Sequence, residues 1–107
     1  MTDKQIVLTT AGSKEEAQKI ASALVEEQLA ACVNVVGPIS STYRWHGKVE
    51  NAEEFLLIIK TTAGAYSRVA EAIRRLHSYD LPEIIQLSIT DGSAEYLAWI
   101  EEAVKPK

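Results

Sequence analysis

The feature that most constrains the fold is a pair of long strand-like segments in the middle of the chain, residues 32–45 and 49–59, joined through His46-Gly47. A His-Gly pair supplies the permissive backbone that a hairpin tip needs. Gly37-Pro38 predicts a bend in the first segment, because proline cannot donate to a strand ladder. Both segments exceed the usual strand length of about 5 or 6 residues. We therefore expect a long antiparallel hairpin that projects past the body of the domain.

The remaining segments alternate between strand-like and helix-like periods. A β-branched run precedes a helix that Ser13 can cap, with Glu16 in the capping-box position. Pro82 marks the start of a last strand, and Ser93 can cap a short third helix. The expected order is a strand at 6–10, a helix from 13, the hairpin, a helix at about 65–77, a strand at 83–89 and a helix that includes 96–104.

This order is the βαββαβ, or ferredoxin-like, plan of the α+β class, with an extra C-terminal helix. It predicts a four-stranded antiparallel sheet with two helices on one face. The length of 107 residues, with 47% hydrophobic and 24% charged residues, fits one domain over 1–107 and leaves no room for a second.

The second arm of the hairpin is apolar on both faces. Phe55, Leu57 and Ile59 point one way, and Leu56 and Ile58 point the other. Two helices can cover only one face of the sheet, so a second apolar face needs another cover. We expect a homo-oligomer. The alternative is a tight monomer whose aromatic side chains pack on their own strands.

Charge and cysteine content exclude several classes of protein. The net charge is −4, from 11 basic and 15 acidic residues, and no basic stripe is present, so nucleic acid is not an expected partner. The single cysteine, Cys32, cannot form an internal disulfide, which fits a reducing compartment. No apolar run is long enough to span a membrane, and no signal peptide begins the sequence. A cytoplasmic protein with no membrane partner is expected.

The densest polar cluster is the segment His77-Ser78-Tyr79-Asp80-Leu81-Pro82-Glu83. It places an imidazole, a phenol and two carboxylates on one connection, the kind of segment that hosts ligands. The alternative is that His77 interacts with the negative end of the preceding helix while Tyr79 packs under the loop. Lys60, at a strand end, could hold an anion, pair with Glu83 or simply be solvated.

No motif points to a reaction. Cys32 lies in an apolar strand, where a thiol is usually a small buried hydrophobe; a Cys32–His77 nucleophile pair is the minority alternative. The sequence has no phosphate-binding glycine loop, no Gly-x-Ser-x-Gly and no paired carboxylates at hydrolase spacing. No catalytic residue is predicted, and we do not expect an enzyme.

Three phrases together resemble the CutA divalent-cation tolerance family: L-A-A-C-V-N at 29–34, Y-x-W-x-G-K at 43–48 and H-x-Y-x-x-P-E at 77–83. The resemblance covers nearly the whole chain. It implies a tight homotrimer similar in architecture to PII signalling proteins, with hairpins that reach neighbouring subunits. It also implies copper or another divalent cation as ligand, and clefts between subunits as the ligand site.

The matching positions give the expected site residues. The metal ligands implied are His77, Cys32 and Glu83, and the ligand cleft would contain Tyr43, Trp45, Lys60 and Tyr79. Some relatives carry a cysteine where this chain has Thr9 and a second histidine where it has Leu76. These differences remove soft ligands and favour a weaker site that uses His77 with Glu83 or Asp80.

The expected function is that of a trimer that binds copper or other divalent cations and contributes to the response to metal ions. One alternative is a PII-like sensor whose clefts bind a small anionic metabolite on Lys60, oriented by Tyr79 and Glu83. A structural scaffold that engages other proteins through its hairpin tips and acidic surface is a further alternative.

Overall fold

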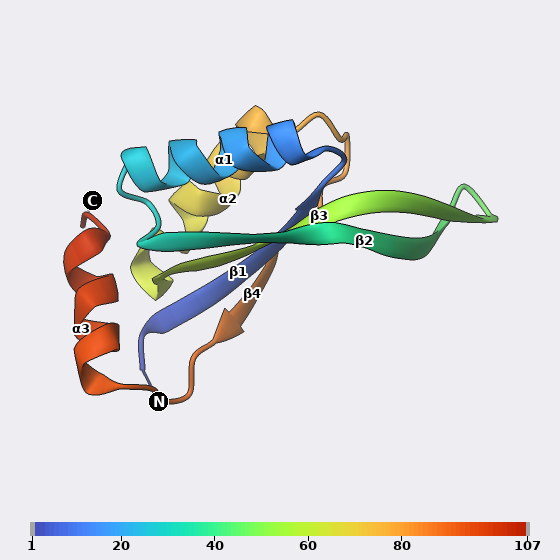
Figure 1. Ribbon diagram of the computed structural model, residues 1–107. Coiled ribbons are helices and arrows are strands. Elements are labelled where there is room, and N and C mark those ends of the chain that lie inside the picture. The colour runs from blue at the N-terminus through green and yellow to red at the C-terminus, as the bar shows by residue number, and fades with distance from the viewer. Residues whose placement is uncertain (1, 107) are drawn as a thin grey trace.

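The computed structural model describes residues 2–106 and confirms the expected fold. A four-stranded antiparallel sheet has the strand order β2-β3-β1-β4. Helices α1 and α2 lie together on one face of this sheet, and α3 lies at one end of it (Figure 1). The elements are β1 (Lys4–Ala11), α1 (Lys14–Glu26), β2 (Cys32–Trp45), β3 (Lys48–Thr62), a 3-10 turn (Ala63–Ala65), α2 (Tyr66–Leu76), β4 (Ile85–Ser88) and α3 (Ala94–Ala103).

Both predicted serine caps are present. The Ser13 hydroxyl accepts a 3.1 Å hydrogen bond from the backbone N–H of Glu16, and the Ser93 hydroxyl accepts one of 3.3 Å from that of Tyr96. Each bond satisfies an N–H that has no partner inside its own helix. The carboxylate of Glu16 has a more distant role, because it accepts hydrogen bonds from Ser78 beyond the end of α2.

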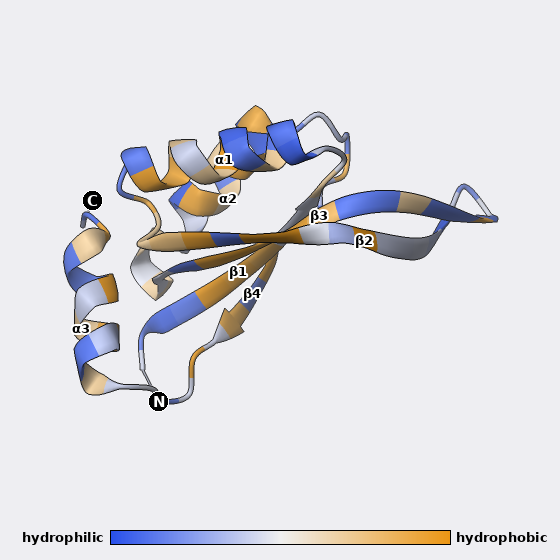
Figure 2. Ribbon diagram, viewed as in Figure 1, coloured by the Kyte–Doolittle hydropathy of each residue, from blue (hydrophilic) through white to orange (hydrophobic). Residues whose placement is uncertain are grey.

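The hairpin of β2 and β3 extends well past the helices, as expected (Figure 1). Trp45 pairs with Lys48, and His46 and Gly47 form the turn between them with φ angles of 51° and 79°. The register shifts between Val36 and Ile39, at the predicted bend. Figure 2 shows that the far half of the hairpin is mostly hydrophilic, whereas the half that continues into the sheet is hydrophobic.

The last strand is shorter than the sequence predicts. Strand β4 covers Ile85–Ser88 instead of 83–89, because the chain that follows α2 joins β1 only at Ile85, opposite Leu8, although β1 itself continues to Ala11. Residues 83 and 84 therefore belong to the connection between α2 and β4. As a result, β1 continues past the end of β4, with one of its edges free of a strand partner.

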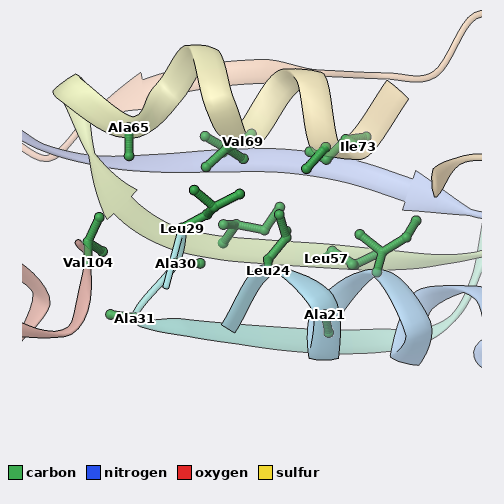
Figure 3. Packing of buried hydrophobic residues seen from close by; sticks show 14 of the residues in the cluster. Ala21, Leu24, Leu29, Ala30, Ala31, Leu57, Ala65, Val69, Ile73 and Val104 are labelled. Atoms are coloured by element: carbon green, nitrogen blue, oxygen red, sulfur yellow. The ribbon is translucent and has the colours of Figure 1, made fainter. Parts of the chain in front are cut away.

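The core lies between the two main helices and the sheet (Figure 3). Each of its large side chains contributes about 1.5–3 kcal/mol by leaving water. The largest fully buried apolar side chains are Ile20, Leu24, Leu57, Ile59, Ile73, Ile100, Val7 and Val69. This packing fixes the sheet from which the site residues extend.

The opposite face of the sheet is also apolar, and α1 and α2 do not reach it. Val7 and Ile59 pair on the helix side, so their neighbours Leu8 and Ile58, which also pair, point to the other face. Leu8 pairs on its second side with Ile85 of β4. We call this the open face. The expectation of two apolar faces is confirmed for the subunit.

Candidate functional site

A cavity of about 780 Å³ lies between the hairpin and the α2–β4 connection. We call it the hairpin cleft. Its aromatic wall consists of Tyr43, Trp45 and Tyr79, its carboxylates are Glu50, Glu54, Asp80 and Glu83, and the other lining residues are Thr10, Ser41, Thr42, Leu81 and Pro82. None of these lining residues is basic. The cleft is thus an acidic, partly aromatic hollow.

Strand geometry places the hairpin's contribution to the cleft. Tyr43 and Trp45 stand two positions apart on β2, so their side chains lie on the same side of the strand. Glu50 pairs with Tyr43 across the hairpin, and Glu54 pairs with Ile39 directly beyond the register shift. Both strands therefore supply polar or aromatic groups to one hollow.

Glu54 and Tyr79 join the two walls of the cleft. Glu54 is only 8% exposed, and its Oε2 accepts a 2.9 Å hydrogen bond from the Tyr79 hydroxyl. Burial, together with this bond to a carboxylate, raises the pKa of Tyr79 to about 12. The phenol therefore keeps its proton at physiological pH and serves as the donor.

His77 lies directly behind this pair, with no exposed side-chain surface. The backbone N–H of Tyr79 donates to Nδ1 over 3.1 Å, so a neutral ring carries its proton on Nε2, which lies 2.6 Å from the carbonyl oxygen of Thr10. Thr10 is on the part of β1 that continues past β4. The imidazole thus gives a hydrogen-bond donor to a backbone carbonyl that lies beyond the end of the β1–β4 ladder. It also accepts from the backbone of Tyr79 and so orients that residue.

Glu16 fastens the same connection to α1. Its carboxylate accepts hydrogen bonds from the Ser78 backbone N–H at 2.7 Å and from the Ser78 hydroxyl at 3.1 Å, and lies 3.9 Å from Nδ1 of His77. Burial by itself raises the pKa of Glu16, but the two bonds from Ser78 outweigh it and hold the pKa below its ordinary value. The cleft wall is therefore held at both β1 and α1.

Five of the residues expected from the sequence line the cleft: Tyr43, Trp45, Tyr79, Asp80 and Glu83. Lys60 and Cys32 are elsewhere, paired across β3 and β2, where the Lys60 ammonium group donates to the side chain of Asn34. The suggested pairing of Lys60 with Glu83 is replaced by this contact, because Lys60 is in the sheet and Glu83 is in the connection.

The expected ligands His77, Cys32 and Glu83 do not form one cluster in the subunit. Over residues 2–106, no group of three or more His, Cys, Asp or Glu side chains is arranged to hold a metal ion. Both nitrogens of His77 already have partners. Coordination by His77 therefore requires one of those hydrogen bonds to break.

Sequence reasoning missed Glu50 and Glu54 as cleft residues. The available signal was the position of Glu54, which precedes the apolar run 55–59 and shares a strand face with Leu56 and Ile58. An acidic residue on an otherwise apolar face indicates a partner or a site. No helix in the described part of the chain is both long and apolar enough to cross a membrane.

Comparisons with known proteins place this architecture in a family. The family model described as CutA1 divalent ion tolerance protein matches residues 5–103. A divalent-cation tolerance protein CutA from Thermus thermophilus is 48% identical over 92% of this chain and 96% of its own length. The chloroplastic protein CutA of Arabidopsis thaliana is 43% identical over 94% of this chain, which spans about 55% of that relative's length.

Solved structures agree with the sequence comparison. The divalent cation tolerance protein (Cut A1) from Thermus thermophilus superimposes with a TM-score of 0.94 at 47% identity, over 95% of this chain and 99% of that one. At this identity, the similarity extends from the fold to the family.

Proposed function

The chain belongs to the CutA1 divalent ion tolerance family, and from this premise we propose that it is a homotrimer that binds copper or another divalent cation and contributes to cation tolerance. The observation that carries the cation-binding part is the charge of the hairpin cleft. Four carboxylates line it and no basic side chain does, so the hollow attracts positive charge.

The homotrimer rests on the open face. Ile85 and Leu87 are each 46% exposed, and they extend the apolar surface of Ile6 and Leu8, their partners on β1. A contiguous apolar sheet face of this kind is typical of a subunit interface. A second and third copy of the chain, as the family resemblance implies, would cover it and bring the hairpins beside neighbouring subunits.

The metal site is proposed to be completed between subunits. Glu83 supplies an oxygen ligand from the cleft, with Asp80 beside it on the same connection. Because no three ligands gather in one subunit over residues 2–106, the remaining donors must come from a neighbouring copy or from rearrangement. Cys32 and His77 are the proposed soft and nitrogen donors. His77 could coordinate only after it releases Thr10 or Tyr79.

Calorimetric titration of the metal-free protein with copper and with zinc tests this proposal, with light scattering on the same sample. We expect a trimer that binds copper stoichiometrically per subunit, with a micromolar or lower dissociation constant. Glu83→Gln should weaken binding about tenfold or more by removing a charged ligand. Glu71→Gln, an exposed carboxylate on α2, is the matched control and should bind as the wild type does.

The predicted ligand His77 is tested by His77→Ala, which should weaken copper binding and leave assembly intact. Circular dichroism should accompany this variant, because the imidazole also holds the connection to Thr10. An intact trimer that binds neither copper nor zinc would contradict direct metal binding and leave tolerance as an indirect effect.

The size of the cleft favours a second candidate, a PII-like module that binds a small molecule. A volume of about 780 Å³ lies within the roughly 300–1,000 Å³ usual for small-molecule pockets. An anionic metabolite, however, would have to bind near Lys60, because the cleft itself is acidic.

We propose no catalytic step for either candidate. We also propose a cytoplasmic location, whereas the Arabidopsis relative is named chloroplastic.

A further inference from the structure

The two tryptophans of the chain lie at opposite ends of the subunit, and both are exposed. Trp45, near the end of the hairpin, is 41% exposed, and Trp99, on α3, is 43% exposed. The subunit measures 44 Å along its longest axis, and Figure 1 shows the hairpin and α3 at its two ends. Exposed tryptophan is enriched where proteins contact a partner. Each end of the subunit is therefore a surface that another molecule would cover.

The end of the hairpin is basic. We call residues 44–49 the hairpin tip; it contains Arg44, His46 and Lys48 and no carboxylate. Lys48 pairs with Trp45 across the turn, so the two side chains lie on the same side with their Cβ atoms about 5 Å apart. No ion pair among residues 2–106 includes Lys48. The tip thus presents an indole and an ammonium group side by side.

The exposed face of α3 is acidic. Glu95, Trp99 and Glu102 follow one another at helical spacing on this face, whereas Ile100 is buried in the core. The ring of Tyr96 lies beside that of Trp99, with centroids 5.4 Å apart. The sequence of α3 contains three glutamates and no basic residue. We call Glu95, Tyr96, Trp99 and Glu102 the α3 stripe.

Glu102 occupies an electrostatically unfavourable position in the subunit. It lies in the last turn of α3, near the negative end of the helix dipole, and no basic residue is in that turn. The adjacent Glu101 forms an ion pair with Lys4, but no ion pair among residues 2–106 includes Glu102. A cation supplied from outside the subunit would relieve this repulsion. The α3 stripe therefore favours a basic partner.

The hairpin tip matches the α3 stripe in spacing as well as in charge. Trp99 and Glu102 are three residues apart on a helix, which places their Cβ atoms about 5–6 Å apart. Trp45 and Lys48 have nearly the same separation across the hairpin. An ammonium group can therefore meet a carboxylate while the two indoles pack together. The partner that fits the α3 stripe is the hairpin tip of another copy of this chain.

We propose that Trp45 and Lys48 of one copy dock on Trp99 and Glu102 of the next copy. This contact rests on the homotrimer of the proposed function and adds to it a second surface, away from the open face. Because the contact joins two different surfaces, every copy offers one of each, and the assembly closes head to tail as a ring. A trimer would contain three such contacts.

Charge reversal tests the ion pair. Lys48→Glu and Glu102→Lys should each raise the concentration at which the trimer half-dissociates about tenfold, because each replaces an attraction with a repulsion in all three contacts. The double variant Lys48→Glu with Glu102→Lys should return to within about twofold of the wild type. Arg74→Glu, which reverses an exposed charge on α2, is the control and should assemble normally.

Light scattering through a dilution series at low salt measures these effects, with urea added to bring the wild type into range, since urea carries no charge. Glu102→Lys also removes an unfavourable interaction with the helix dipole, so it should not destabilise the subunit itself. Weaker assembly of this variant would therefore report the contact between copies.

Chemical cross-linking tests the direction of the contact. In a Cys32→Ser background, Lys48→Cys with Glu102→Cys should give covalent trimers on a denaturing gel after treatment with bismaleimidoethane. Neither single-cysteine variant should do so, because a head-to-tail contact places a tip thiol only against an α3 thiol. Lys48→Cys with Glu71→Cys, on the exposed face of α2, is the matched control and should remain uncrosslinked.

Two results would overturn this contact while leaving the homotrimer standing. The first is a trimeric wild type whose dissociation is unaffected by either reversal and whose double-cysteine variant yields no covalent trimer. The second is a charge-swapped double variant that dissociates at least as readily as the weaker single variant, which would show that Lys48 and Glu102 act independently. A wild type that is monomeric would contradict the homotrimer itself and this contact with it.

Discussion

The hydroxyl of Tyr79 donates a 2.9 Å hydrogen bond to the carboxylate of Glu54, a residue 25 positions earlier in the chain. This bond connects the α2–β4 connection to the second strand of the hairpin. The backbone N–H of Tyr79 also donates a hydrogen bond to Nδ1 of His77, and Nε2 of His77 is hydrogen-bonded to the carbonyl oxygen of Thr10 on β1. The cleft therefore has walls fixed relative to one another before any ligand arrives.

Tyr79→Phe should lower the free energy of unfolding by about 1 kcal/mol per subunit, since it leaves Glu54 without its donor. The partial exposure of Tyr79 keeps the effect at the low end for a bond to a charged group. Guanidinium unfolding at fixed protein concentration measures it. Tyr96→Phe, which alters an exposed tyrosine of α3, is the control and should be neutral.

The same bond predicts a loss of stability at high pH. The folded-state pKa of Tyr79, about 12, lies above the ordinary tyrosine value of 10.0, so folding favours the protonated phenol. This contribution is complete below pH 10 and is lost as pH rises through about 12. The wild type should therefore lose more stability across this window than Tyr79→Phe does. An equal loss in both proteins would contradict the assignment.

Glu16 should govern part of the response to acid. Its pKa is held below the ordinary glutamate value of 4.5, so its contribution is present above pH 4.5 and is lost as pH falls through the folded-state value. Glu16→Gln should be less stable than the wild type at neutral pH and should show a shallower decline in acid. Unfolding curves between pH 7 and pH 3 measure the slope. Glu26→Gln, exposed on the same helix, should keep the wild-type slope.

Gly12→Ala should disturb the cleft through Tyr79. A Cβ at position 12 would lie 3.0 Å from the Tyr79 hydroxyl oxygen, which is tighter than ordinary van der Waals contact. The phenol must shift away, so its bond to Glu54 weakens and its pKa should move down from about 12. Tyrosinate absorbance during alkaline titration reports this shift. At Gly64 an added Cβ meets nothing within 4 Å, so Gly64→Ala is the matched control.

Local signals in the sequence were sufficient for much of the fold. Ser13 and Ser93 cap their helices, and His46-Gly47 turns the hairpin, because each of these roles depends on a few neighbouring residues. The length of β4 was predicted wrongly. The ladder between β4 and β1 covers only Gln5–Leu8, although β1 continues to Ala11, so the end of β4 depends on where the α2–β4 connection meets a strand about eighty residues earlier.

The site was only partly predictable for a similar reason. Tyr43 and Trp45 could be placed together because they are two residues apart on one strand. The role of Glu54 depends on Tyr79, and the bonds of His77 depend on a carbonyl that β4 leaves free at Thr10. Contacts between residues so far apart in the chain produce no local pattern in the sequence. Lys60 was expected in the cleft but lies elsewhere, because the register of β3 places it opposite Cys32 of β2.

The homotrimer gives a prediction about the open face. Ile85 and Leu87 are each 46% exposed in the subunit and should be buried once other copies cover the sheet. Ile85→Lys with Leu87→Lys would then place two unpaired charges in an apolar interface, which is strongly unfavourable. Light scattering should show a trimer for the wild type and monomers for the double variant.

The double variant should still fold, because neither side chain contributes to the core between helices and sheet. Circular dichroism checks this. Val25→Lys is the matched control: Val25 is 42% exposed but lies on α1, away from the open face, so this variant should remain trimeric. If the double variant assembled as the wild type does, the open face could not be the interface. Dissociation of Val25→Lys as well would show that added charge, and not the choice of face, disrupts assembly.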